Sequence, residues 1–265
     1  MTTLTPQQLL DPLPIPAVFL LFAIIALGAY EVGYRFGRWW QDRTPEEKEG
    51  PTGMIVGSIL ALMAFMLAVT MGMASDRFDQ RRALVLQEAN SIGTTYLRAG
   101  YLPEPVSTQA RNLLREYVPL RVNTSDREQL AANFARSAQI LDSLWAQAEM
   151  LAKTEPSSET LALYISSLND TIDLHETRVT AIVYARVPET VVILLMAGAA
   201  LTLGMVGYTA GLSRRRSLLS AVVLVVVLGA VITLVVDLDR PRDGFLQVSQ
   251  QPLIDLQAQI GAPTP

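Results

Sequence analysis

Long stretches of uncharged residues dominate the pattern of hydrophobic and polar positions along the chain. They cover residues 12–30, 50–75, 190–213 and 217–236. A helix needs about 20 residues to cross a hydrocarbon core of about 30 Å, so each stretch is long enough to span a membrane. The first stretch is not preceded by Lys or Arg and is not followed by a small-residue cleavage site, so we interpret it as a retained helix rather than a signal peptide. The pattern therefore predicts four membrane-spanning helices.

Between the second and third stretches, apolar residues recur at helical spacing and no alternating strand pattern occurs. The second spanning helix is expected to continue to about Leu97, because helix-breaking residues cluster only at Pro103 and Pro105. Ser125 and Glu128 have the spacing of a capping box, which predicts a helix that begins there and runs to about residue 153.

A second helix of this region is expected to begin at Thr154, because Pro156 would then lie near the first helical position. Its apolar residues continue at helical spacing towards the third span, so we expect a helix that is interrupted only at Pro188. The region is thus expected to consist of two long helices that flank a shorter helical pair.

The predicted fold class is all-α, with four transmembrane helices and a helical extramembrane domain between the second and third. We divide the chain into a first helix pair (residues 1–75), a helical domain continuous with helices two and three (76–189), a second helix pair (190–236) and a C-terminal tail (237–265).

Composition supports a membrane protein and excludes several functions. Half of the residues are apolar and 17% are charged, against about 25% in a typical soluble chain. The net charge of −4 offers no basic surface for a nucleic acid. The chain has no cysteine and one histidine, which excludes disulfides, thiol catalysis, cysteine-bound metals and a multi-histidine metal site within one chain. We therefore expect the lipid bilayer as a partner, and no nucleic acid, metal or cofactor.

Positive residues near the spans indicate an orientation in a cell inner membrane. The two short loops carry Arg35, Arg38, Arg43 and Lys48, and then Arg214, Arg215 and Arg216. Cytoplasmic loops are enriched in Lys and Arg, which favours short loops inside and the helical domain outside. The opposite side carries Arg77, Arg81, Arg82, Arg178, Arg186, Arg240 and Arg242. The two sets are equal in number, so the prediction rests on the higher density of charge in the short loops.

Small residues form stripes on two of the spans. The second span carries Gly57, Ala61, Ala64, Ala68, Gly72 and Ser75 at steps of three or four. The third span carries Ala200, Gly204, Gly207 and Gly211. Such stripes let membrane helices approach closely. They are expected to serve helix packing within the chain, or alternatively a subunit interface or pore wall.

The polar candidates have structural and functional interpretations. Arg77 and Arg81 share a helix face, where they form either a girdle at the membrane surface or the fixed charges of an anion-attracting pore mouth. His175 is expected on a solvated or ion-paired helix face. No glycine-flanked serine, phosphate-binding loop, dinucleotide fingerprint or HExxH motif occurs, so no catalytic residue is assigned and the protein is not expected to be an enzyme.

Acidic residues also follow the fourth span, interleaved with arginines. They are Asp237, Asp239 and Asp243, with Arg240 and Arg242 between them. Their spacing does not match a calcium-binding EF-hand loop, and the arginines would repel a cation. We expect salt bridges within this segment.

Three runs of residues resemble one family. They are Ser75-Asp76-Arg77-Phe78-Asp79 with Glu88-Ala89-Asn90 and Tyr96-Leu97-Arg98, then Leu113-Leu114-Arg115-Glu116-Tyr117-Val118, then Asp237-Leu238-Asp239-Arg240-Pro241 with Gly244 and Val248-Ser249. Together they are similar to the bestrophin-like domain of bacterial membrane proteins. That family is distantly similar to bestrophins, which are pentameric anion channels with a four-helix membrane part and a cytosolic helical domain. The resemblance implies a homo-oligomer, a pentamer if it holds, and a cytosolic domain, in opposition to the charge pattern.

The resemblance also implies candidate pore-lining residues. Residues 74–82 are similar to the bestrophin stretch Ala-Tyr-(Asp/Glu)-Arg-Trp-Trp-Glu-Gly-Arg, and alignment on Arg77 places the bestrophin neck at Ala61, Phe65 and Val69. Two departures weaken the match to a narrow aromatic gate: the paired tryptophans are replaced by Phe78 and Asp79, and the first neck position is alanine.

Two functions remain open at this point. The first is an oligomeric ion channel, selective for anions, whose second helix lines the pore. The alternative is a non-conducting membrane scaffold or sensor whose helical domain binds a partner.

Overall fold

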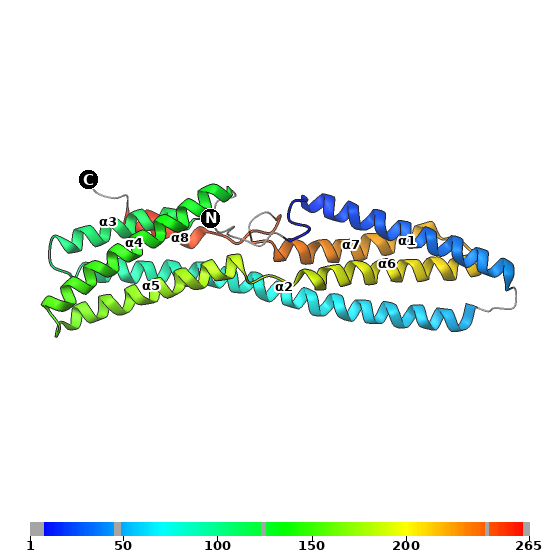
Figure 1. Cartoon of the computed structure of the whole chain (residues 1–265), viewed down its shortest axis with the longest axis horizontal. Coiled ribbons are helices and arrows are strands. Elements are labelled where there is room, and N and C mark those ends of the chain that lie inside the picture. The colour runs from blue at the N-terminus through cyan, green and yellow to red at the C-terminus, as the bar shows by residue number, and fades with distance from the viewer. Residues whose placement is uncertain (1–7, 45–48, 123–125, 242–243, 262–265) are drawn as a thin grey trace. The chain divides into compact units, whose positions relative to one another are not determined.

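The computed structural model describes residues 8–44, 49–122, 126–241 and 244–261, and within these ranges the regular structure is helical, with no strand. The helices are α1 (Ile15–Arg43), α2 (Glu49–Ala99), α3 (Val106–Arg121), α4 (Arg127–Thr154), α5 (Glu159–Val183), α6 (Glu189–Leu212), α7 (Leu218–Asp239) and α8 (Gln251–Ile260), as Figure 1 shows. The predicted all-α fold class is confirmed.

Four helices are long and apolar enough to cross a membrane: α1, α2, α6 and α7. Each overlaps one of the four predicted spans to within three residues at its ends or extends beyond it. The second is a single helix of 51 residues, which confirms that the helix continues through Leu97. The charge-free stretches located these helices correctly because a run of about 20 apolar residues is a local signal that needs no tertiary context.

The chain divides into two compact units. The membrane unit consists of Gln7–Arg77 and Arg186–Leu246, and the helical unit includes Phe78–Ala185 and Gln247–Pro265. Helix α2 therefore contributes its first half to the membrane unit and its second half to the helical unit.

Within the membrane unit, α1 and α6 lie in backbone contact because glycines face each other. A Cβ atom on Gly33 would lie 1.9 Å from the carbonyl oxygen of Gly204, and one on Gly207 would lie 2.1 Å from that of Tyr30. Only glycine allows so close an approach, which is the usual role of small residues between membrane helices. The buried core of the unit is formed by Phe22, Ala26, Tyr30, Met63, Leu67, Leu195, Ala199, Leu203, Ala221, Val225, Leu228 and Ile232.

The helical unit has a separate core, to which the second half of α2 and helices α3, α4, α5 and α8 contribute. Its largest fully buried side chains are Tyr117, Tyr164, Ile92, Leu114, Ile140, Leu144, Leu168 and Leu253. Leu253 belongs to α8, a helix that the sequence did not predict. The unit is thus completed by a segment that follows the last membrane helix.

The helix predicted from Ser125 is present, and its start differs by one residue, whereas the next predicted start was wrong. The N-cap of α4 is Asp126, whose carboxylate accepts from the backbone N–H groups of Glu128 and Gln129; Ser125 lies outside the described residues. Helix α4 continues to Thr154, and α5 begins only at Glu159, where the Ser158 hydroxyl accepts from the N–H of Leu161. A serine N-cap satisfies an otherwise unpaired backbone donor, which an early proline does not.

The predicted near-continuous helix into the third span is also corrected. Helix α5 ends at Val183, and α6 begins at Glu189 with Pro188 as its N-cap. The residues between them leave the helix and lie next to a polar cluster that holds this segment.

Candidate functional site

Helix α2 has a clear inner face in the membrane unit. Met63, Leu67 and Thr70 are buried, as are Val56 and Ala74. Successive residues turn by about 100°, so these positions fall on one side of the helix. This side packs into the core of the membrane unit.

The predicted neck residues lie on the opposite side. Phe65 is 65% exposed and Val69 is 48% exposed, and Ala61 is exposed as well. Phe65 lies about 160° around the helix from both Met63 and Leu67. Arg77, at the end of the membrane unit's part of α2, is half-buried. The chain therefore presents an apolar face of α2 that its own core does not use.

The two stripes of small residues behave differently. Gly207 and Gly211 on α6 lie against α1, where added Cβ atoms would meet the carbonyl oxygens of Tyr30 and Tyr34. On α2, added Cβ atoms at Gly57 and Gly72 would meet nothing within 4 Å. The residues between them on the stripe, Ala61, Ala64 and Ala68, are exposed. Among the described residues, the α2 stripe is thus not packed within the chain.

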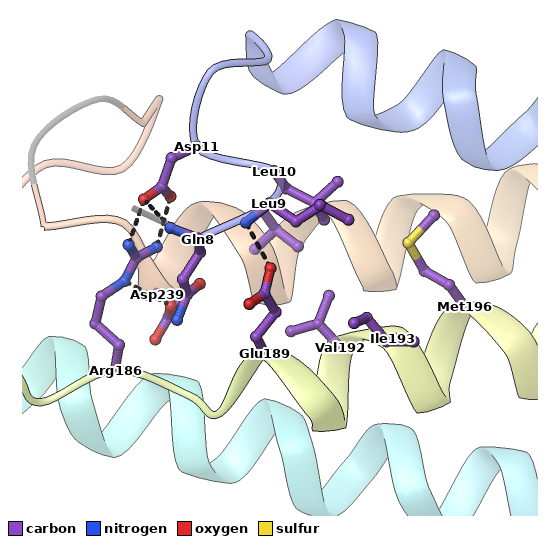
Figure 2. A pocket seen from close by; sticks show the side chains of 11 residues that line it. Gln8, Leu9, Leu10, Asp11, Arg186, Glu189, Val192, Ile193, Met196 and Asp239 are labelled. Atoms are coloured by element: carbon purple, nitrogen blue, oxygen red, sulfur yellow. Dashed lines mark hydrogen bonds and ion pairs between the residues drawn. The ribbon is translucent and has the colours of Figure 1, made fainter. Parts of the chain in front are cut away.

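A polar cluster holds the segment before α1 against the start of α6 (Figure 2). The guanidinium of Arg186 donates to both carboxylate oxygens of Asp11, at 2.7 and 2.8 Å, and its Nε donates to Asp239 at 3.2 Å. Asp239 also accepts from the backbone N–H of Val187 at 2.7 Å. Burial alone would raise the pKa of Asp11, but the hydrogen bond and charge of Arg186 outweigh it and hold that pKa below its usual range.

Asp239 binds an arginine outside this segment and Asp237 binds backbone N–H groups within it, which corrects the prediction of salt bridges within the segment. Asp239 pairs with Arg186, and Asp237 accepts from the backbone N–H groups of Phe245 and Leu246 at 2.7 and 3.0 Å. Asp243 and Arg242 lie outside the described residues. The carboxylate of Asp237 therefore holds backbone N–H groups in place, and that of Asp239 holds the side chain of Arg186.

The space beside this cluster is small. A cavity of about 30 Å³ lies next to Asp11 and Arg186, with Val192 and Met196 of α6 on its apolar side. Organic ligands occupy pockets roughly ten times larger, so the cavity has room for water rather than for a substrate.

The helical unit contains a buried charge cluster of its own. Glu88 of α2 accepts hydrogen bonds from Arg121 of α3 and Arg178 of α5, and these side chains are 0%, 1% and 4% exposed. Sequence analysis missed this cluster. Glu88 shares a helix face with Val85 and Ile92, both buried, and a charged residue on an apolar face was the signal that could have revealed it.

His175 lies next to this cluster and is buried, so the solvated face was wrong, whereas the face that it shares with Arg178 is ion-paired through Glu88. Its Nδ1 shares a hydrogen bond of 3.1 Å with the hydroxyl of Tyr117. Burial, followed by the positive charge of Arg121, lowers the pKa of His175 to about 4. Burial likewise raises the pKa of Tyr117. Both side chains are therefore neutral at pH 7 and pack inside the helical unit.

Neither the polar cluster around Arg186 nor the charge cluster around Glu88 has the arrangement of side chains that a catalytic site needs. Their carboxylates are bound to arginines or backbone N–H groups. Within the described ranges no group of three or more His, Cys, Asp or Glu residues is placed to hold a metal ion. The feature left for function is the exposed apolar face of α2.

Comparison with protein families gives one match, to the bestrophin-like domain, over residues 20–253. The chain belongs to the bestrophin-like family. This match confirms the resemblance read from the three sequence runs. A comparison with curated protein sequences gave no match.

Solved structures share the fold of the chain. A bacterial bestrophin homologue from Klebsiella pneumoniae, crystallised as a point mutant, matches with a TM-score of 0.65 at 14% identity, over 93% of this chain and 97% of that one. Another point mutant described as a bestrophin homologue from Klebsiella pneumoniae matches with a TM-score of 0.63 at 14% identity, over 92% and 99% of the two chains. A structure described as a membrane protein matches with a TM-score of 0.61 at 14% identity, over 93% and 97%. Family and fold together support a channel-like, multi-pass membrane protein.

Proposed function

We propose that this bestrophin-like protein is a homo-oligomeric anion channel of the inner membrane, with α2 lining the pathway. The observation that carries the proposal is the position of Phe65 and Val69, which are exposed on the side of α2 opposite its buried face. A membrane helix with its inner face already packed has a second apolar face available for neighbouring subunits and for a central axis. A closed symmetric ring, a pentamer in this proposal, would place copies of that face around the axis.

The order of residues along α2 fits such a pathway. Ala61, Phe65 and Val69 follow one another at intervals of four, so they would form successive apolar rings, and apolar rings gate by dewetting. Arg77 follows two turns later, about 80° further around the helix from Val69. A ring of arginines at this level attracts anions.

The small residues of α2 fit the subunit contact. Gly57, Ala64, Ala68 and Gly72 lie to one side of Phe65, roughly 20–100° around the helix. In the proposed assembly they would let the α2 helix of one subunit approach its neighbour closely while Phe65 remains on the axis. The helical domain of residues 76–189 would then extend the assembly outside the bilayer.

The proposal is tested by recording currents from the purified protein in planar bilayers. Replacement of Phe65 by alanine should raise conductance, because the ring becomes wider and less apolar at its narrowest level. Replacement of Arg77 by alanine should shift the reversal potential in a salt gradient away from anion selectivity, because the positive ring is lost. Wild-type protein that is silent at all voltages and pH values, or currents that neither change affects, would refute it.

Matched controls come from α1. Ile24 is 70% exposed, similar to Phe65, and the side chain of Arg35 is 77% exposed. Ile24→Ala and Arg35→Ala remove the same kinds of side chain from a helix that the proposal keeps off the axis. Both should leave conductance and selectivity unchanged.

Measurement of mass in detergent separates this function from the alternative. A ring of subunits is required for a central pathway, whereas a scaffold or sensor needs none. A monomer or dimer would rule out the channel and favour a non-conducting protein whose helical domain binds a partner.

A further inference from the structure

An apolar groove of about 540 Å³ lies between α1 and α6 of the membrane unit, the two helices that run side by side in Figure 1. It exists because the helices meet through Gly33 and Gly204, which leave no side chains to fill the space beside their contact. The side chains that border it include Ala29, Val32 and Phe36 of α1 and Ala200, Met205 and Tyr208 of α6. Ala29 lies in the uncharged stretch of α1, and Ala200 and Tyr208 lie in that of α6, so the groove begins at the depth of lipid acyl chains. It continues towards the membrane surface, where Glu31 and Arg35 follow on α1.

Aromatic side chains continue from the groove towards the C-terminal end of α1. The ring of Phe36, which borders the groove, stacks on Trp39 with centroids 5.7 Å apart. The guanidinium carbon of Arg43 lies 3.9 Å from the centre of the Trp39 ring. These positions share a helix face with Ala29 and Val32, since they follow at steps of three or four. The groove and the arginine thus belong to one continuous surface.

The length of this surface matches one leaflet of a bilayer. From Ala29 to Arg43 the helix rises about 21 Å, at about 1.5 Å per residue. Half of a bilayer, with its headgroup region, is roughly 20–22 Å thick. A lipid with its acyl chain beside Ala29 and Val32 would therefore have its headgroup at the level of Arg43.

The end of the groove carries a small excess of positive charge, since residues 31–49 and 214–216 together contain seven Lys and Arg against five Asp and Glu. Glu31 forms ion pairs with Arg35 and Arg216, and Asp42 pairs with Arg214. Three more arginines at this end have no acidic partner among the residues that the structure describes: Arg38, Arg43 and Arg215. This imbalance favours an anionic ligand over a zwitterionic one.

We propose that the groove binds one anionic phospholipid, with an acyl chain between α1 and α6 and its phosphate at Arg43. A guanidinium presents planar N–H donors that match phosphate oxygens, and the stack on Trp39 occupies only its face, so those donors stay available. Trp39 and Trp40 lie at the level of the glycerol, where tryptophan side chains are enriched in membrane proteins. The site does not depend on conduction, so its test is independent of the channel.

Native mass spectrometry of the intact protein released from detergent tests the site directly. The probes are phosphatidylglycerol and phosphatidylcholine with identical acyl chains, titrated separately. The wild type should bind the first phosphatidylglycerol about five-fold more tightly than phosphatidylcholine, the effect of one favourable charge at the surface. Arg43→Gln should weaken both lipids, because both carry the phosphate that Arg43 binds, but it should weaken phosphatidylglycerol more, since choline offsets the phosphate charge in phosphatidylcholine. The preference should therefore fall towards one.

The control for charge is Arg35→Gln, which removes an exposed arginine about 100° around α1 from Phe36. It should change neither affinity by more than about two-fold, because a single charge outside the site contributes only through long-range, screened attraction. An equal loss in Arg35→Gln and Arg43→Gln would overturn the proposal in favour of diffuse attraction of lipid to the arginine-rich end.

The groove itself is tested by filling it. Ala200→Phe places a ring in the groove and should weaken the first binding event of both lipids, whereas Val226→Phe, at an exposed position of α7 that does not line the groove, should not. Both variants must keep the oligomeric mass of the wild type. A change of mass in Ala200→Phe with unchanged lipid binding would show that a second copy of the chain covers the groove, and would refute the lipid site.

Discussion

Replacement of Glu88 by glutamine should strongly destabilise the helical unit. Glu88 is the carboxylate between Arg121 and Arg178, and the three side chains are at most 4% exposed. Glutamine has nearly the same shape but no charge, so the variant keeps the packing and leaves two buried guanidinium groups without a counter-charge. Removal of one partner from a buried ion pair costs about 3–5 kcal/mol.

This loss is large enough to measure as a change in Tm. For a chain of this size 1 kcal/mol corresponds to a shift of roughly 2–4 °C, so Glu88→Gln should lower Tm by roughly 6–20 °C. The assay is circular dichroism at the helical band during heating of the purified protein in detergent. The fold is helical, so loss of the signal follows unfolding directly.

The chain offers a matched control in Glu116, which pairs with Arg136 on the surface. The side chains of this pair are 41% and 47% exposed, so water screens their attraction. Glu116→Gln should leave Tm within about 2 °C of the wild type. Equal shifts in Glu88→Gln and Glu116→Gln would refute the argument that burial sets the cost. Apolar replacement of Glu88, Arg121 and Arg178 together should return Tm towards the wild-type value, because no buried charge then remains.

Three further predictions concern orientation, pH and helix packing. A reporter fused at Ser125 should be exported and one within residues 44–50 should stay inside, if the arginine density of the short loops sets the topology; the reverse result would favour the bestrophin arrangement, with the helical domain in the cytoplasm. Because burial lowers the pKa of His175 to about 4, the unfolded chain binds this proton more readily, so stability should fall as the pH decreases from about 6.5 to about 4. Chemical denaturation at several pH values should show a shallower fall in His175→Gln. Gly207→Ala should lower Tm, since its Cβ would lie 2.1 Å from a backbone oxygen, whereas Gly28→Ala meets nothing within 4 Å and should not.

The membrane spans were predictable because their signal is local. Each uncharged stretch is sufficient by itself to indicate a helix in lipid, whatever the rest of the chain does. Helix starts in the helical unit were less predictable, since Pro156 and Ser158 both favour a start and only the hydrogen bond from Leu161 decides between them. The pairing of Arg186 with Asp11 joins residues 175 positions apart, and no sequence pattern specifies such a partner.

The environment of His175 could have been read from the sequence. Leu161, Tyr164, Leu168 and Thr171 recur at steps of three and four on α5, and His175 is the next position of this stripe. Asp173 and Glu176, which favoured a solvated face, are exposed on other sides of the helix, whereas Arg178 continues the buried stripe. The face of α2 is a different case. The sequence identifies Phe65 and Val69 as apolar, but only the packing of Met63 and Leu67 into the core reveals that they point away from the chain.

Cysteine accessibility on α2 is the most direct test of the proposal that this face lines an aqueous pathway. The chain has no native cysteine, so Phe65→Cys and Ile24→Cys each introduce a single thiol with no background. A charged, water-soluble thiol reagent reacts with the thiolate, which forms only where water reaches the side chain. We predict that the reagent modifies Phe65→Cys and blocks its current in planar bilayers, while Ile24→Cys is neither modified nor blocked. Phe65→Cys that resists the reagent, or whose current is unchanged after complete modification, would contradict the account.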